Sequence, residues 1–389
     1  MSTLTQYLSR NVRQYGIWLA LVAIIILFQV LTNGLLLRPN NVASLVQQNA
    51  YVMILAIGMV MVIVARHIDL SVGSVVAFVG GVTAIMMRSW DLPWLLAVVL
   101  ALVLGVVIGA WQGFWIAYVG IPAFIVTLAG MLIFRGLAIV LVGTTVAGLP
   151  RPFNAISNGS VPNVLGFMAN LDVITLIIGL VAILGLTFTQ IRARIAKRKH
   201  HLVVEPLVAF VGKLVLFAVL IGYGTWILSR SAGGTPIVLV IVGVLIVVYT
   251  FVMNRTVFGR HVYAVGGNLH AAKLTGINTR RVDFMIFVNM GVLAALAGVV
   301  TTSRAGAAVA SAGEMFELDA IAAAFIGGTA VTGGIGRVSG AIIGALIMGV
   351  LNMGLSIMAV DPAWQQTIKG LVLLLAVAFD LVSKRRSGR

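Results

Sequence analysis

The chain has no cysteine and very little charge. Of its 389 residues only 9% are charged, and 61% are hydrophobic. A soluble domain normally carries about a quarter charged residues, so this chain cannot cover a water-facing surface and we expect its main solvent to be lipid. The lack of cysteine excludes disulfides, thiolate metal sites and a cysteine nucleophile within this sequence.

Acidic residues are also scarce, since 10 Asp and Glu stand against 26 Lys and Arg, giving a net charge of +16. This excess could indicate nucleic-acid binding, but in a membrane protein basic residues collect in loops that stay inside the cell. The N-terminal segment has the basic-then-apolar order of a signal sequence. No small-x-small cleavage site follows its long apolar run, so we predict a retained first helix.

Apolar runs recur along the whole chain, and each bilayer crossing needs about 20 mostly apolar residues. We therefore predict one all-α domain over residues 1–389, a polytopic integral membrane protein with about 12 transmembrane or re-entrant helices. The span 317–331 is short, and it either crosses or re-enters. The expected spans are 17–36, 42–64, 71–87, 93–118, 122–142, 171–190, 206–228, 235–253, 282–303, 317–331, 338–358 and 364–382.

The distribution of basic residues predicts the topology. If the N-terminus lies inside, the outer segments hold only Arg38, Arg88, Arg151, Arg230 and Arg304. Three others fall within spans, namely Arg135, Lys213 and Lys369, and Lys213 and Lys369 lie near enough to span ends to snorkel. All other Lys and Arg lie on inner segments, including the basic run 191–201. The positive-inside rule therefore places both termini in the cytoplasm.

The inner segment 254–281 is too patterned for a plain linker. VGGN at 265–268 is a turn signal with glycines that can take positive φ, and Asn268 can cap the following helix, LHAAKLTGI. Ala272 and Gly276 lie four residues apart on one face, while Leu274 and Ile277 offer apolar anchors. Such a helix suits docking into a groove of another protein; the alternative is a helix lying on lipid.

Four strings in this order resemble the monosaccharide branch of the permeases of ATP-binding-cassette (ABC) importers. They are GMVMVIVARHIDLSVGSVVAFVGG, IPAFIVTLAGMLIFRG, GRHVYAVGGNLHAAKLTGIN and GEMFELDAIAAAFIGGTAVTGGIGRVSGAIIGALI. The extra helix pair within 154–230, around the basic cytoplasmic loop 191–201, is similar to the longer xylose-type permeases. In the third string two alanines followed by a glycine resemble the family's coupling motif, although His270 stands where the family usually has an acid.

The resemblance implies an importer permease for a monosaccharide such as xylose, in the bacterial cytoplasmic (inner) membrane. Two copies would form the pathway, a periplasmic binding protein would deliver the sugar, and a cytoplasmic ATPase would bind the coupling loop 254–281. No G-x-x-x-x-G-K-[ST] phosphate loop occurs here, so ATP and Mg would bind the partner and this chain would hold no cofactor, metal or catalytic residue. The implied coupling residues are His270, Ala271, Ala272, Leu274, Gly276 and Ile277.

Polar residues within the spans are candidates for the translocation path, because each is costly in lipid. Gln47, Gln48 and Asn49 carry amides that suit a sugar, with hydrogen bonding between helices as the alternative. Arg135 lies deepest and needs a partner or a water-filled cavity, and the conceivable acids are Asp69, Glu317 and Asp319. Glu317 and Asp319 could instead cap the helix 317–331.

Residues 65–74, ARHIDLSVGS, interrupt an otherwise apolar stretch. The topology predicts a joint at the cytoplasmic end of the second and third spans, with Asp69 and Ser71 capping the helix that begins near residue 71. A lining of the inner gate or path is the alternative. The same ABC permease class carrying another small solute, or an ion-coupled secondary transporter, is the alternative function, although few acids lie deep enough to bind ions.

Overall fold

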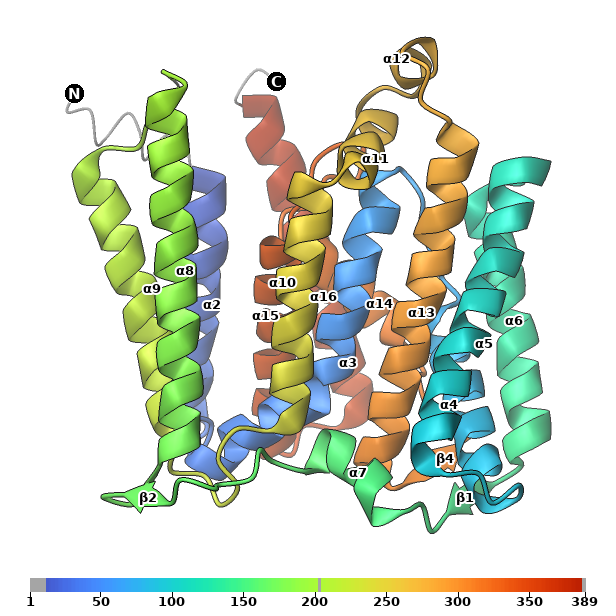
Figure 1. The fold of residues 1–389 in the computed structure, drawn as a ribbon, viewed down its shortest axis with the longest axis horizontal. Helices are drawn as coiled ribbons and strands as arrows, with labels where there is room; N and C mark the ends of the chain where they lie inside the picture. The colour runs from blue at the N-terminus through green and yellow to red at the C-terminus, as the bar shows by residue number, and fades with distance from the viewer. Residues whose placement is uncertain (1–11, 202–203, 387–389) are drawn as a thin grey trace.

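The computed structural model describes residues 12–201 and 204–386. Long helices run between two ends of a bundle (Figure 1). We name these ends after the short helices at them, the α12 end (Leu269–Leu274) and the α7 end (Arg151–Asn158). The start of α2 and the end of α16 both lie toward the α12 end (Figure 1). Arg10 and Arg389, predicted on the inner side, lie outside the described residues.

Most of the long helices follow the predicted spans within a few residues. The helices before the basic run are α2 (Val12–Leu31), α3 (Pro39–Val64), α4 (Val72–Arg88), α5 (Trp94–Phe114) with the π-helix η1 (Trp115–Val119), α6 (Ala123–Val142) and α8 (Val173–Lys199). Those after it are α9 (Leu207–Leu228), α10 (Ile237–Arg255), α11 (Val257–Gly267), α13 (Thr279–Ala305), α14 (Phe316–Ile326), α15 (Val338–Ile357) and α16 (Pro362–Arg386). Strand β1 (Thr145–Ala147) pairs antiparallel with β4 (Ala307–Val309), and β2 (Phe167–Met168) with β3 (Leu171–Asp172).

Eight of the described helices are long and apolar enough to cross a membrane, and the apolar stretches in α2 and α4 are shorter. The all-α membrane class is therefore confirmed. The core lies around α3, and α13, α14 and α15 pack against it. In the most apolar stretch of α3, 83% of the residues are buried. Helices α8 and α9 stand at one edge of the bundle (Figure 1). Only 11% and 6% of the residues in their apolar stretches are buried.

Glycines let α5 and α13 approach at backbone distance. A Cβ added at Gly291 would lie 2.2 Å from the carbonyl oxygen of Gly105, and one at Gly109 would lie 2.4 Å from the carbonyl oxygen of Phe287. No real Cβ tolerates such contacts, so these positions require glycine. Close backbone approach replaces the hydrophobic effect as a source of helix association in lipid.

The span 317–331 is helical only over α14. Before α14, strand β4 pairs with β1 at the α7 end, and Gly313, at φ +72°, then packs against the backbone of Gly73 inside the bundle. After α14, the Gly334 N–H donates to the Val64 carbonyl at 2.8 Å. Val64 is the last residue of α3, at the end of that helix away from the α7 end. The chain before, through and after α14 therefore runs from the α7 end toward the α12 end of the bundle.

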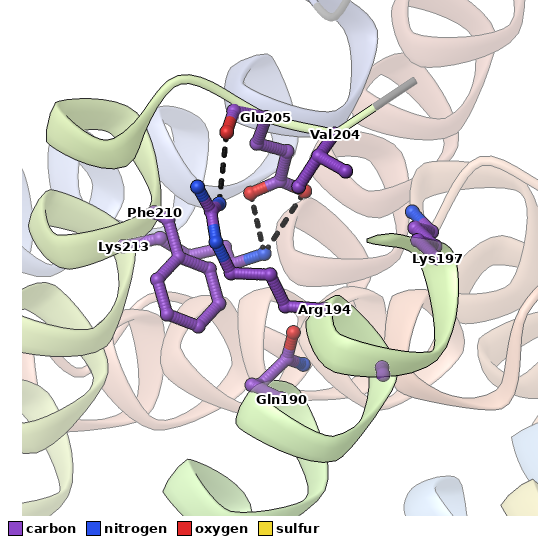
Figure 2. A pocket seen from close by; sticks show the side chains of 8 residues that line it. Gln190, Arg194, Lys197, Val204, Glu205, Phe210 and Lys213 are labelled. Atoms are coloured by element: carbon purple, nitrogen blue, oxygen red, sulfur yellow. Dashed lines mark hydrogen bonds and ion pairs between the residues drawn. The ribbon is translucent and has the colours of Figure 1, made fainter. Parts of the chain in front are cut away.

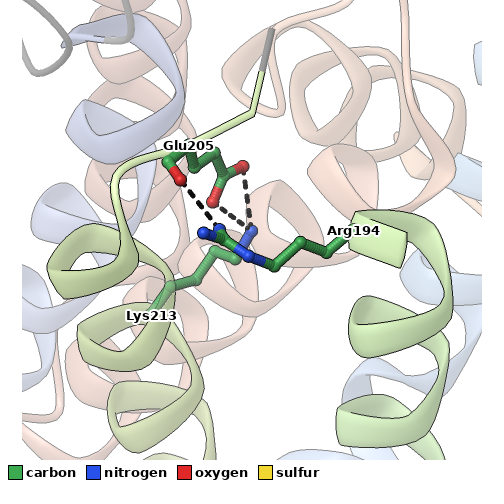
Figure 3. A network of polar contacts seen from close by, with 3 residues as sticks. All are labelled: Arg194, Glu205 and Lys213. Atoms are coloured by element: carbon green, nitrogen blue, oxygen red, sulfur yellow. Dashed lines mark hydrogen bonds and ion pairs between the residues drawn. The ribbon is translucent and has the colours of Figure 1, made fainter. Parts of the chain in front are cut away.

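The basic run 191–201 was expected to form a loop. Most of it is helical instead, because α8 continues to Lys199. Alanine, arginine and lysine favour helix, and cations at a helix C-terminus interact favourably with its dipole. Lys213 does not snorkel alone but pairs with Glu205 at 3.0 Å, and Arg194 donates to the Glu205 carbonyl at 2.8 Å (Figure 3). Phe210 lies beneath Arg194, whose guanidinium is 4.6 Å from the ring centroid (Figure 2).

Candidate functional site

The coupling segment folds into two short helices rather than one. Helix α12 is shorter than predicted, but Asn268 caps it as expected, since its side chain accepts from the Ala271 N–H at 3.0 Å. Gly276, at φ +83°, ends the turn, and the Ile277 N–H donates back to the Ala272 carbonyl at 3.1 Å. This left-handed closure is a common way to satisfy the last carbonyls of a helix.

Helix α11 was not predicted. The signals for it are present: Thr256 accepts from the Gly259 N–H at 3.1 Å as an N-cap, and Val262 and Val265 are buried at helical spacing. The expected turn at VGGN is wrong, because both glycines belong to α11. Gly266 is needed for close approach, since a Cβ there would lie 1.6 Å from the Val64 carbonyl oxygen.

The predicted coupling residues divide between two faces of α12. His270, Ala271, Leu274 and Gly276 are exposed, and the Leu274 side chain is 89% exposed. Ile277 is half-buried. Ala272 differs from the expectation of an open small-residue face, because it is 4% exposed and packs inside the chain.

A hollow of about 570 Å³ lies beside the C-terminal end of α12, between α11 and α13. Its lining is mainly apolar, with His261 and Arg281 as its ionisable residues, and no acidic residue occurs in 254–281. The lining residues are Val257, Phe258, His261, Thr275, Gly276, Ile277, Asn278, Arg281, Val282 and Met285. A partner that fits this surface would combine apolar contacts with acidic ones.

The α11 helix is fixed to the loop before α15 by Tyr263, whose hydroxyl donates to the Gly336 carbonyl at 2.7 Å. Burial raises the pKa of the Tyr263 hydroxyl, an effect that nearby Arg337 partly offsets. The hydroxyl therefore remains a donor at neutral pH. The coupling segment is thus a folded, attached unit rather than a loose loop.

Residues 65–71 connect α3 to α4 and contact the coupling segment directly. Arg66, at φ +71°, donates from Nε to the Gly266 carbonyl and from Nη2 to the Gly267 carbonyl, each at 2.6 Å. His67 Nε2 lies 3.2 Å from a carboxylate oxygen of Asp283 in α13. Both side chains therefore contact elements on either side of α12.

At the other end of this connection, Asp69 accepts from the Ser71 N–H at 2.8 Å and from the Ser71 hydroxyl at 2.6 Å. The helix begins at Val72, as predicted, but Ser71 makes no side-chain cap. Its hydroxyl instead accepts from Gln112 of α5 at 2.7 Å, and Asp69, Ser71 and Gln112 are all buried. Gln112 was not among the residues predicted from the sequence.

An acid was the expected partner of Arg135, but the hydrogen bonds that its guanidinium makes go to backbone carbonyls. Its Nη1 donates to the carbonyls of Ala310 and Ala312, at 2.9 and 2.7 Å. These carbonyls belong to the non-helical segment that enters the bundle before α14, where no helical N–H meets them. The guanidinium thus stabilises irregular backbone within the bundle.

Asp319 forms a second buried polar cluster. The N-cap of α14 makes no side-chain hydrogen bond, but Glu317 and Asp319 both lie in its first turn, where acids interact favourably with the helix dipole. Asp319 accepts from the Tyr51 hydroxyl at 2.8 Å and pairs with Lys369 at 3.3 Å. Lys369 therefore does not snorkel. Glu317 lies against Gly73, where an added Cβ would be 2.3 Å from its Oε2.

The three amides of the second span have different surroundings. Asn49 is buried and accepts a hydrogen bond from the Asn352 side chain of α15 at 3.2 Å. This contact matches the alternative of hydrogen bonding between helices rather than sugar binding. Gln47 reaches the Asn158 carbonyl at the end of α7, at 3.4 Å, and Gln48 is exposed. Residues 12–201 and 204–386 contain no group of three His, Cys, Asp or Glu side chains that could hold a metal.

Comparison with known proteins identifies relatives over nearly the whole length. The family model described as branched-chain amino acid transport system, permease component, matches residues 41–377. The xylose transport system permease protein XylH of Escherichia coli K12 is 42% identical over 382 residues, covering 97% of this chain and 94% of that protein. XylH of Haemophilus influenzae is 40% identical, covering 97% of this chain and 98% of that protein.

The ribose import permease protein RbsC of Bacillus subtilis is 34% identical over 369 residues, covering 95% of this chain and 92% of that protein. No solved structure matches the chain. The resemblance read from the four strings is confirmed by these matches. With its apolar helices, the chain is a multi-pass membrane protein that belongs to the permease family of ABC importers, together with the xylose and ribose permeases.

Proposed function

We propose that this chain is the membrane subunit of an ATP-driven importer for a monosaccharide, with xylose or a similar pentose as the substrate. The observation that carries this proposal is the 42% identity to a xylose permease over 97% of the chain. The alignment spans the coupling segment and both buried polar clusters, so the shared region includes the parts with a transport role. The chain itself performs no catalysis in this proposal.

ATP and Mg bind a separate cytoplasmic ATPase, which docks on the α12 end. The exposed Leu274 and the hollow beside α12 support this docking, because together they offer a projecting apolar side chain and an adjacent recess. The α12 end is then cytoplasmic, as are both termini, and the membrane is the bacterial inner membrane. The proposal takes the chain to cross the membrane about 12 times, with 306–337 as one of the crossings.

The sugar reaches the opposite end, the α7 end, on a periplasmic binding protein. Two copies of the chain form the pathway, and its polar lining draws on Gln47, Gln48, Glu317 and the Asp69–Ser71 pair. These residues are supported by their positions inside the bundle or near its α7 end. Asn49, Arg135 and Asp319 already have protein partners, and we assign them to holding the pathway's shape.

Reconstitution tests the function. Proteoliposomes containing this chain, its ATPase and the binding protein should accumulate labelled xylose only when ATP is inside with the ATPase. Omission of any one partner should abolish uptake. Uptake driven by a proton or sodium gradient without ATP would contradict the proposal, and uptake of ribose but not xylose would reassign the substrate.

A further inference from the structure

Residues 65–71 lie between the coupling segment and the interior of the bundle. We propose that this connection transmits the movement of α12 to the substrate path, and that Arg66 and His67 are the residues that position it. The inference rests on the proposed function, since it takes α12 to be the element that the ATPase moves. It assigns a role to two side chains that neither dock the partner nor line the path.

The first attachment is made by Arg66. Its guanidinium donates to two successive carbonyls, those of Gly266 and Gly267, each at 2.6 Å. These are the last residues of α11 and immediately precede Asn268, the cap of α12. A planar guanidinium bound at two points fixes orientation as well as position. A shift at the start of α12 is therefore passed directly to Arg66.

The second contact is the close approach of His67 to Asp283, which follows α12 in the chain. Asp283, 3.2 Å from His67 Nε2, belongs to the beginning of α13, which follows α12 after four residues, 275–278. Both side chains are mostly buried, with 21% and 16% exposed. The segments before and after α12 thus contact two consecutive residues of the same connection, the first through hydrogen bonds and the second through the close approach of an imidazole and a carboxylate.

The far end of the connection reaches into the bundle. The Ile68 carbonyl accepts from Thr127 of α6 at 3.3 Å, and Ser71 joins Asp69 to Gln112 of α5. Next along the chain, Gly73 meets Gly313 in the segment that leads to α14. Residues 67–71 are neither helix nor strand, but hydrogen bonds at Ile68, Asp69 and Ser71 fix them to the bundle, so little of the chain between Arg66 and α4 is free. Displacement at Arg66 must therefore move α4 relative to its neighbours.

The test separates sugar uptake, ATP hydrolysis and ATPase docking in the reconstituted complex. With Arg66→Ala, the ATPase should co-purify normally and hydrolyse ATP, while xylose uptake should fall about tenfold, a typical size for coupling between two sites. The ATP consumed per sugar should rise by the same factor. Arg66→Lys should recover part of the uptake, because an ammonium can still donate to these carbonyls. Arg192→Ala, which removes an exposed arginine from α8, should change nothing.

The His67–Asp283 contact provides an independent pair of variants should Arg66→Ala fail to assemble. His67→Ala and Asp283→Ala should each raise the ATP consumed per sugar, and the double exchange His67→Asp with Asp283→His should restore it. An unchanged ratio in the single variants would overturn the inference, as would loss of ATPase binding, which would make the contact part of the dock. ATP-independent uptake by the unaltered protein would overturn the proposed function instead.

Discussion

Lys369 of α16 lies 3.3 Å from Asp319 of α14, and these two charges meet within the bundle although 50 residues separate them. The Asp319 carboxylate also accepts from Tyr51 of α3, so three helices converge on one acid. A charge in this setting is tolerated only when it is paired. The pair therefore ties α16 to α14 within the bundle.

Breaking this pair should destabilise the protein, because the remaining charge is left buried. Lys369→Met should lower the free energy of unfolding by about 3 kcal/mol. The double variant Lys369→Met with Asp319→Leu should lose less than Lys369→Met alone. Denaturant titration in mixed micelles would measure both, and additive losses in the double variant would contradict a direct pair.

Replacement of Gly291 by alanine should separate α5 from α13. The new Cβ would meet the Gly105 carbonyl oxygen at 2.2 Å, so we expect a loss of about 1–3 kcal/mol from overpacking. Gly136→Ala in α6 is the matched control, because nothing lies within 4 Å of its added Cβ, and it should be neutral or stabilising. Thermal melting in detergent compares the two, and equal melting temperatures would contradict the close contact.

Leu274 should be the principal apolar contact of α12 with its ATPase. Leu274→Asp removes a side chain whose burial contributes about 2 kcal/mol, so ATPase affinity should fall more than tenfold. Because Leu274 is 89% exposed, folding and membrane insertion should not change. Leu274→Met is the conservative control and should keep ATPase binding. Normal ATPase co-purification with Leu274→Asp would refute the docking assignment.

Arg135 should be required for the irregular segment before α14. Arg135→Leu leaves the carbonyls of Ala310 and Ala312 without this donor, and an unsatisfied buried carbonyl costs about 1–3 kcal/mol. Arg135→Lys should retain part of the stability, because an ammonium can donate to both carbonyls. Protease sensitivity near residues 310–312 would report the loosened segment, and an unchanged cleavage pattern would refute this role.

Much of this molecule follows from local sequence. Long apolar runs separated by polar turns predict helices wherever they occur, and most boundaries in the described residues agree within a few positions. Asn268 was identifiable as a cap because capping depends on the next three residues alone. The family was also identifiable, because four ordered strings carry it.

Tertiary structure decided the partners of the polar groups. Arg135 had three conceivable acids in the sequence, yet backbone carbonyls from a distant segment bind it. Ala272 belonged to a plausible docking face until packing buried it. Likewise, 65–74 was predicted as a joint between two spans, and only the fold places Arg66 against α11 and His67 against α13. The physical reason is range: periodicity and capping act over a few residues, whereas a side chain's partner depends on which distant helices meet it.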